Sequence, residues 1–93
     1  MMYEIKYTKQ FKKDYKLAKK RGKDLTLLKE IIKKISNDEK LDEKYRNHEL
    51  SGDWAGHWEC HIQPDWLLIY RKDIDVLVLT LSRTGTHSDL FSK

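Results

Sequence analysis

Two segments in the first half of the chain repeat apolar residues at the spacing of an amphipathic helix. They cover residues 9–21 and residues 25–36. Each follows a residue that commonly caps a helix N-terminus, Thr8 and Asp24 respectively. Gly22 suits the left-handed conformation in which helices often end. The pattern therefore predicts two helices joined by a short link, which together form a helical hairpin.

The other apolar segments have the spacing of β-strands. Residues 3–7 and residues 58–63 alternate apolar and polar side chains, which is typical of strands with one buried face. Residues 66–70 are apolar throughout, as expected for a strand that is covered on both faces. A tight turn at residues 63–66 joins these two strands. Residues 76–82 are rich in β-branched and apolar side chains and predict a last strand.

Less regular segments complete the chain. Residues 36–47 are polar and predict a loop with a short helical turn, and residues 48–50 predict a short strand. Residues 83–86 are expected to end the last strand, and residues 87–91 to form a C-terminal helical turn. The predicted fold is a single α+β domain over residues 1–93. Its N-terminal strand and helical hairpin pack on one face of a small, mostly antiparallel β-sheet, which gives two layers.

Cysteine content and hydropathy limit the possible locations of the protein. Cys60 is the single cysteine, so an intrachain disulfide and a multi-cysteine metal site are excluded, and a reducing compartment is favoured. The N-terminus has no apolar signal core, and the longest apolar run, residues 66–70, is too short to cross a membrane. We therefore expect a cytoplasmic protein without a membrane partner.

Positive charge is concentrated in the predicted helices. Residues 6–34 contain twelve Lys or Arg and three Asp or Glu, although the net charge of the whole chain is only +4. One interpretation is an ordinary solvated helical surface. The other is a positive surface that attracts a polyanion or an acidic partner protein.

Several ionisable residues lie at or near the predicted strand ends and turns, where a small antiparallel sheet could bring them into one concavity. Histidine exchanges protons near neutral pH, a guanidinium can hold a phosphate by two bonds, and an aromatic ring can stack on a base. Together these are the groups needed to cleave RNA without a metal ion. We predict His48, His61, Asp65 and His87 as catalytic residues and Arg83 and Phe91 as substrate-binding residues.

Other uses of the same residue types are less well supported. Any single histidine is more often structural or exposed than catalytic, and His57, beside Gly56, is expected to be exposed. Zinc is the competing ligand, but Cys60 and His61 point to opposite faces of a strand and cannot easily share one ion. No serine lies in a nucleophile elbow, and nucleotide-binding loops are absent. We therefore expect no metal and no cofactor.

Three motifs in order resemble the YafQ type of RelE/ParE-superfamily toxins. They are His-Glu-Leu-Ser-Gly-Asp-Trp at 48–54, Glu-Cys-His-Ile-Gln-Pro-Asp-Trp-Leu-Leu-Ile-Tyr at 59–70 and Arg-Thr-Gly-Thr-His-Ser-Asp-Leu-Phe at 83–91. With the helical N-terminal half, the resemblance covers nearly the whole chain. It implies a RelE/ParE-like fold and an active site at the motif positions His48, His61, Asp65, His87 and Phe91. Arg83 is not part of this implied set and rests on its charge and placement.

The resemblance also implies a function and partners. Such toxins belong to type II toxin–antitoxin pairs and stop translation as metal-independent endoribonucleases that cut mRNA in the ribosomal A site. The implied partners are the ribosome, its mRNA and a cognate DinJ- or RelB-like antitoxin, in a heterotetramer that contacts operator DNA only through the antitoxin. Two alternatives remain open: a ParE-like gyrase inhibitor that acts by binding, and a non-catalytic RNA- or protein-binding module.

Overall fold

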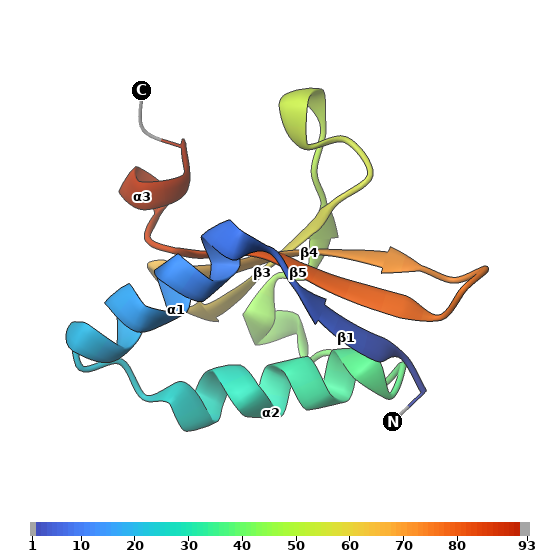
Figure 1. Cartoon of the computed structure of the whole chain (residues 1–93), viewed down its shortest axis with the longest axis horizontal. Coiled ribbons are helices and arrows are strands. Elements are labelled where there is room, and N and C mark those ends of the chain that lie inside the picture. The colour runs from blue at the N-terminus through green and yellow to red at the C-terminus, as the bar shows by residue number, and fades with distance from the viewer. Residues whose placement is uncertain (1, 92–93) are drawn as a thin grey trace.

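A five-stranded sheet, with two long helices on one of its faces, forms the frame of the molecule (Figure 1). The structure is a computed structural model and describes residues 2–91. Its elements are β1 (Glu4–Tyr7), α1 (Lys9–Lys20), α2 (Leu25–Ser36), the 3₁₀ turn η1 (Glu43–Tyr45), β2 (His48–Glu49), the 3₁₀ turn η2 (Gly52–Trp54), β3 (Trp58–Gln63), β4 (Trp66–Asp73), β5 (Val78–Gly85) and α3 (His87–Phe91).

The helical hairpin begins and ends where the capping residues predict. Thr8 Oγ1 accepts a hydrogen bond of 2.9 Å from the backbone N–H of Phe11, and Asp24 Oδ1 accepts one of 3.0 Å from the N–H of Thr26. Gly22 has φ +78°, the left-handed conformation expected after a helix. The hairpin is therefore confirmed, with α1 ending at Lys20, one residue earlier than predicted.

The strand order is β1-β5-β4-β3-β2, with β1 parallel to β5 and every other neighbouring pair antiparallel. The N-terminal strand β1 therefore lies at one edge of the sheet and pairs only with β5, the last strand of the chain. The predicted two-layer α+β fold with a mostly antiparallel sheet is confirmed. Within residues 2–91, none of the helices has the length and apolar character needed to span a bilayer.

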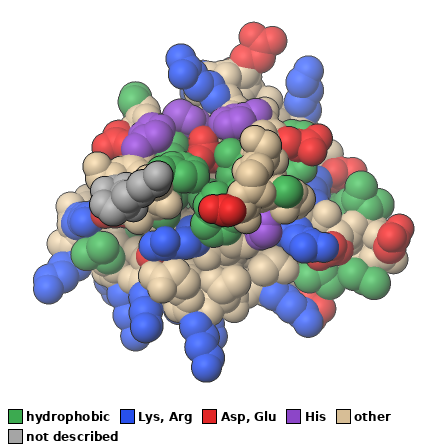
Figure 2. Space-filling view, turned by 90° about the horizontal axis from the view of Figure 1, so that it is seen from above, with side chains coloured by type: hydrophobic (Ala, Val, Ile, Leu, Met, Phe, Trp, Pro, Cys, Tyr) green, Lys and Arg blue, Asp and Glu red, His purple; other side chains and the backbone are tan. Residues whose placement is uncertain are grey.

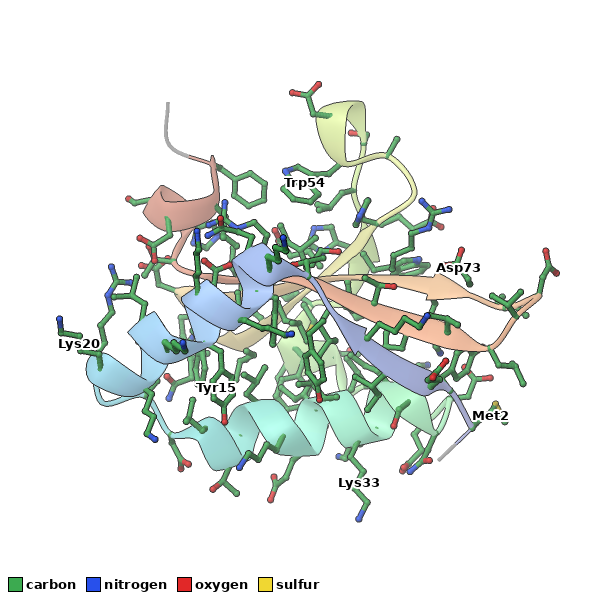
Figure 3. All side chains as sticks on the ribbon, viewed as in Figure 1. Met2, Tyr15, Lys20, Lys33, Trp54 and Asp73 are labelled. Carbon is green, nitrogen blue, oxygen red and sulfur yellow. The ribbon has the colours of Figure 1, made fainter. Side chains whose placement is uncertain are left out.

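Alternate residues of the central strands face two different apolar clusters. On the helix side, Cys60, Trp66 and Leu68 belong to the main core with side chains of α1 and α2. On the other side, Leu67 and Ile69 pack with Leu90 of α3 and with the partly buried Leu50 and Trp54. Figure 1 shows α3 and the loop containing η2 standing on the side of the sheet away from α2, and Figure 3 shows Trp54 directed toward α3.

The last strand differs from its predicted bounds. We predicted residues 76–82 and a break at 83–86, but β5 covers Val78–Gly85. Its start is later because Leu77 adopts φ +53°, which prolongs the turn after β4. Its end is later because a register shift between Ile69 and Tyr70 lets pairing with β4 continue to Gly85. The strand therefore runs almost to the start of α3 and positions that helix.

Candidate active site

Three histidines from three different elements meet on the face of the sheet away from α1 and α2. His48 lies on β2, His61 on β3 and His87 at the start of α3. The ring centroids of His48 and His61 are 6.4 Å apart, and those of His61 and His87 are 5.5 Å apart. Figure 2 shows histidine side chains gathered along one edge of this face. The predicted concavity therefore brings together imidazoles separated by up to 39 residues, with His61 as the neighbour of both others.

Asp65 fixes the orientation of His87. Its Oδ1 accepts hydrogen bonds of 2.9 Å from the His87 backbone N–H and 2.6 Å from His87 Nδ1. These bonds, the backbone one most of all, lower the pKa of Asp65 below its usual range, so the group is a carboxylate at neutral pH. With its Nδ1 proton held by Asp65, His87 presents Nε2 to solvent as the atom that can give or take a proton.

A second carboxylate, Glu59, lies between the other two histidines. It is buried, and one of its oxygens, Oε1, is 3.5 Å from Nε2 of His48 and 3.5 Å from Nε2 of His61. The antiparallel register places Glu59 directly opposite His48. His48 Nδ1 is 2.6 Å from the carbonyl oxygen of Arg46, which can only accept, so Nδ1 carries a proton. In the neutral ring, Nε2 therefore has the lone pair, and this nitrogen faces Glu59 Oε1.

We predict that Glu59→Gln lowers the rate of the RNA cleavage implied by the sequence resemblance by about 100-fold, because the amide keeps the shape of the side chain but removes the charge that can stabilise an imidazolium. The measurement is single-turnover cleavage of ribosome-bound mRNA. Glu49→Gln, an exposed carboxylate on the neighbouring strand β2, is the matched control and is expected to leave the rate unchanged. Equal rates for the two variants would show that Glu59 has no part in the chemistry.

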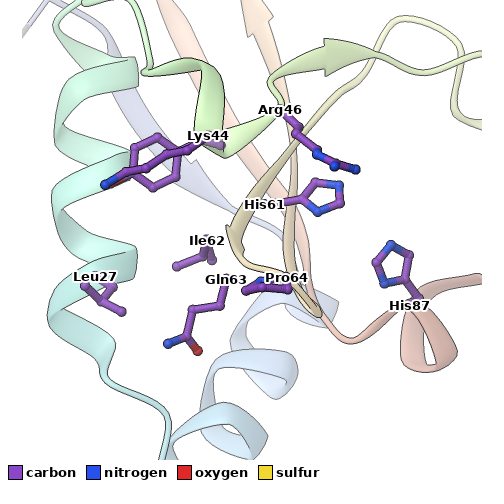
Figure 4. A pocket seen from close by; sticks show the side chains of 9 residues that line it. Leu27, Lys44, Arg46, His61, Ile62, Gln63, Pro64 and His87 are labelled. Atoms are coloured by element: carbon purple, nitrogen blue, oxygen red, sulfur yellow. The ribbon is translucent and has the colours of Figure 1, made fainter.

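A cavity of about 680 Å³ opens beside two of the histidines. His61 and His87 form one end, and the cavity extends past Gln63 and Pro64 to Leu27 of α2 (Figure 4). Its remaining lining residues come from the segment around η1 and from β3: Lys44, Tyr45, Arg46 and Ile62. The cavity is therefore lined by proton-transfer groups together with cationic and aromatic side chains.

The helix that carries His87 is held by a network around Asp89. Asp89 accepts hydrogen bonds from Arg21 Nη1 at 2.6 Å and from the Thr86 N–H at 3.0 Å, and Thr86 Oγ1 accepts one from the Asp89 N–H at 3.0 Å. The Thr86–Asp89 pair forms a capping box. A Cβ on Gly85 would approach the Asp89 side chain to 3.0 Å, so a larger residue at this position would require the Asp89 side chain to shift. These contacts fix α3 against α1 and so position His87.

The Asp89 network predicts an acid-dependent stability. The hydrogen bond from Arg21, and secondly the one from the Thr86 N–H, lower the pKa of Asp89 to about 2. Since the folded-state pKa lies below the unfolded value, the stabilisation is present above about pH 4 and is lost as the pH falls toward 2. Urea unfolding of Asp89→Asn should show less stability than the parent at pH 6 and a weaker loss between pH 4 and 2. Parallel curves for the two proteins would contradict this.

The two residues predicted to bind substrate lie in different surroundings. Arg83 donates to the buried carboxylate of Asp14 from Nε at 3.0 Å and from Nη2 at 3.1 Å, and it does not line the cavity. Asp14 also raises the pKa of Arg83. Phe91 is the last residue of α3 and its side chain is 42% exposed, on the same short helix as His87. Phe91 thus shares a short helix with His87, whereas the Arg83 guanidinium is held by Asp14 outside the cavity lining.

The remaining candidate ligands do not form a metal site. Among residues 2–91, no three His, Cys, Asp or Glu side chains are arranged to hold a metal ion. Cys60 is fully buried on the helix side of β3, and burial raises the pKa of its thiol to about 12. His57, which we expected to be exposed, is half-buried at the edge of the Trp54 ring, and its Nδ1 has no partner among the described residues.

Sequence reasoning missed Glu59 and Arg46. The alternation of β3 placed Glu59 and His61 on one face, and that was the available signal. The sequence did not reveal the register that sets His48 opposite Glu59, because β2 has only two residues and such a short strand carries no pattern from which a register can be predicted. Arg46 lies in a polar segment without periodicity, and its orientation depends on a left-handed backbone that the residue type does not favour.

Comparison with known proteins gives a consistent result. The family model for the bacterial toxin of type II toxin–antitoxin systems, YafQ, matches residues 3–92. The mRNA interferase toxin YafQ of Escherichia coli K12 is 43% identical over 89 residues, which is 95% of each chain.

Solved structures agree with this match. In the E. coli DinJ–YafQ toxin–antitoxin complex, the matching chain has a TM-score of 0.88 at 40% identity, covering 98% of this chain and 99% of that one. A metal-bound toxin from Helicobacter pylori has a TM-score of 0.90 at 38% identity, covering 98% and 100%. Sequence and fold thus agree over nearly the whole length, and the chain belongs to the YafQ family of bacterial toxins from type II toxin–antitoxin systems.

Proposed function

We propose that this chain is an endoribonuclease toxin that cleaves mRNA in the ribosomal A site and so inhibits translation. The observation that carries the proposal is the group of three imidazoles, in which neighbouring rings lie 5.5 and 6.4 Å apart and the rings are backed by two carboxylates. Imidazole–carboxylate pairs are suited to proton transfer near neutral pH. The E. coli relative, 43% identical, is named an mRNA interferase toxin.

In the proposed reaction, a ribose 2′-oxygen attacks the adjacent phosphorus while a base takes its proton. The bond from phosphorus to the 5′-oxygen then breaks, and an acid protonates that oxygen. We assign the acid to His87 in its imidazolium form: Asp65 holds the Nδ1 proton, and the proton on Nε2 passes to the 5′-oxygen, leaving a neutral imidazole. The base belongs to the His48–Glu59–His61 group, since Glu59 can stabilise an imidazolium on either ring. Phe91 stacks on a base of the mRNA.

We propose that the reaction needs no metal ion, since the acid and the base are both supplied by side chains. The H. pylori relative is metal-bound, so the point needs a direct test. Toxin stripped of metal by a chelator, freed of the chelator and checked by mass spectrometry is expected to cleave ribosome-bound mRNA at the rate of untreated toxin. Activity that is lost on stripping and restored by zinc or copper would contradict metal independence.

Ribosome dependence is the second part of the proposal. The helices α1 and α2 carry most of the excess positive charge, with no acidic residue in either first turn, and such a surface suits ribosomal RNA. The test is mapping of mRNA 5′-ends after adding purified toxin to free mRNA and to initiated ribosomes. Cuts within the A-site codon, only when ribosomes are present, are expected. Cutting of free mRNA at the same rate as ribosome-bound mRNA would contradict ribosome dependence and leave the nuclease assignment intact.

The same experiment, together with a gyrase supercoiling assay, separates the alternatives. A gyrase inhibitor would leave mRNA intact and block supercoiling of plasmid DNA by purified gyrase, and it would not need the histidines. A non-catalytic binding module would bind ribosomes without histidine-dependent turnover. The group of His48, His61 and His87 beside two carboxylates favours the nuclease over both.

We further propose that a DinJ- or RelB-like antitoxin neutralises the toxin in the cytoplasm, in a heterotetramer that reaches operator DNA through the antitoxin. The support is the E. coli DinJ–YafQ complex: its matching chain aligns with 98% of the length of this chain at 40% sequence identity. Co-expression with the product of the neighbouring open reading frame, followed by light scattering, tests the partner and the stoichiometry. A monomeric toxin in that experiment would contradict the proposed complex.

A further inference from the structure

Three of the chain's four arginines are already paired with aspartates in the structure: Arg21, Arg71 and Arg83. Arg46 is the exception. Within residues 2–91, its guanidinium has no carboxylate within 4.0 Å, so its charge is available to an anionic ligand.

Arg46 is also the arginine that lines the cavity next to the histidines. It shares the lining of that cavity with His61 and His87. In Figure 4 its side chain extends beside the His61 imidazole, whereas the Lys44 side chain points away toward α2. A phosphate placed against His61 would therefore lie within the reach of the Arg46 guanidinium.

The backbone holds Arg46 in an unusual conformation. Arg46 has φ +48° and ψ +45°, the left-handed region that a residue with a Cβ rarely adopts and that is found more often at functional sites. Its N–H closes the η1 turn on the carbonyl of Glu43 at 3.0 Å, and its carbonyl accepts the bond of 2.6 Å from His48 Nδ1. The residue that orients His48 is thus the residue that would contact the phosphate.

The residues on both sides of Arg46 are anchored. Tyr45 packs against the main core, and the side chain of Asn47 accepts a hydrogen bond of 2.6 Å from the hydroxyl of Tyr70. Because its neighbours are fixed, Arg46 projects from a preorganised segment rather than from a freely moving loop. Such placement lets a charge act on a transition state without a large reorganisation.

We propose that Arg46 binds the scissile phosphodiester and stabilises the phosphorane formed when the 2′-oxygen attacks. This inference rests on the proposed nuclease function. It adds Arg46 to the histidines as a group that stabilises charge and transfers no proton. As the bond from the 2′-oxygen to phosphorus forms, negative charge grows on the two non-bridging oxygens. The planar guanidinium donates two hydrogen bonds to them until the bond to the 5′-oxygen breaks.

Substitution of Arg46 tests this role. Arg46→Gln is expected to lower the single-turnover cleavage rate of ribosome-bound mRNA by about 100- to 1,000-fold, with ribosome binding changed less than about threefold. Arg46→Lys should recover part of the rate, since an ammonium is a point charge without the two-pronged geometry. Arg71→Gln is the matched control because Arg71 pairs with Asp73 away from the cavity, and it should behave as the parent.

The outcomes separate this inference from the proposed function. Arg46→Asn, a residue that tolerates the left-handed backbone, is the second variant if Arg46→Gln does not fold. Either folded variant cleaving within about threefold of the parent would overturn the role of Arg46 and leave the nuclease assignment intact. A parent protein that does not cleave ribosome-bound mRNA would overturn both. Loss of rate in Arg46→Gln together with a normal rate in Arg71→Gln is the predicted result.

Discussion

Replacing His87 by alanine is expected to lower the cleavage rate of ribosome-bound mRNA by at least about 1,000-fold and to relieve growth arrest on expression. His87 is the proposed acid, and alanine removes the imidazole while the backbone N–H that binds Asp65 remains. Because that bond and the Asp89 network stay, α3 should keep its place and the protein should still bind its antitoxin. Primer extension on arrested ribosomes measures the rate.

A control on the same helix makes the His87 result specific. Ser88 is exposed next to His87, and Ser88→Ala should retain full toxicity. Circular dichroism and co-purification with the antitoxin establish that His87→Ala is folded. Full toxicity of His87→Ala at matched expression would rule out His87 as the acid.

Replacing Asp14 by alanine is expected to lower the free energy of unfolding by about 3 kcal/mol. The Asp14 carboxylate is 7% exposed and accepts four hydrogen bonds, from the backbone N–H of Thr84, the side chain of Gln10 and two guanidinium nitrogens of Arg83. Alanine would leave the guanidinium and the buried N–H of Thr84 without their partner. Urea unfolding gives the value, and Lys13→Ala on the exposed face of α1 is the control. A loss no larger than that of the control would contradict the structural role of Asp14.

The pairing of Arg83 with the Asp14 carboxylate raises the question of whether Arg83 has a structural or a substrate-binding role. If Arg83 serves mainly to hold α1 on β5, Arg83→Gln should destabilise the fold but cleave at the parent rate at a temperature where it is folded. If Arg83 binds a phosphate, as the sequence led us to predict, the rate should fall at that temperature as well. A double-mutant cycle with Asp14→Asn measures how much of the effect of Arg83 passes through Asp14.

The fold was predictable wherever a local signal determined it. Thr8 and Asp24 each cap a helix through a side-chain oxygen within three residues, and both helix starts were correct. The turn after β3 was correct because a proline and an aspartate specify it. The end of β5 was not, because a bulge opposite β4 extends the strand, and bulges depend on pairing rather than on composition.

In the candidate site, too, features set by local sequence could be predicted and features set by strand pairing or backbone conformation could not. The convergence of His48, His61 and His87 was predicted from their places at or near strand ends and turns. The register accounts for part of it, because His61 pairs with Leu67 and Leu67 pairs with Gly85, two residues before His87. The roles of Glu59 and Arg46 could not be predicted. Glu59 needs the β2–β3 register, and Arg46 needs a left-handed backbone set by its neighbours.

The most direct test of the nuclease mechanism is a single 2′-deoxy substitution at the ribose where ribosome-bound mRNA is cut. The mechanism makes the 2′-oxygen the nucleophile, so the substituted mRNA should remain intact at that position. The unsubstituted mRNA should give a 2′,3′-cyclic phosphate and a 5′-hydroxyl. Cleavage of the 2′-deoxy mRNA at the same position and rate would contradict the mechanism proposed for the three histidines.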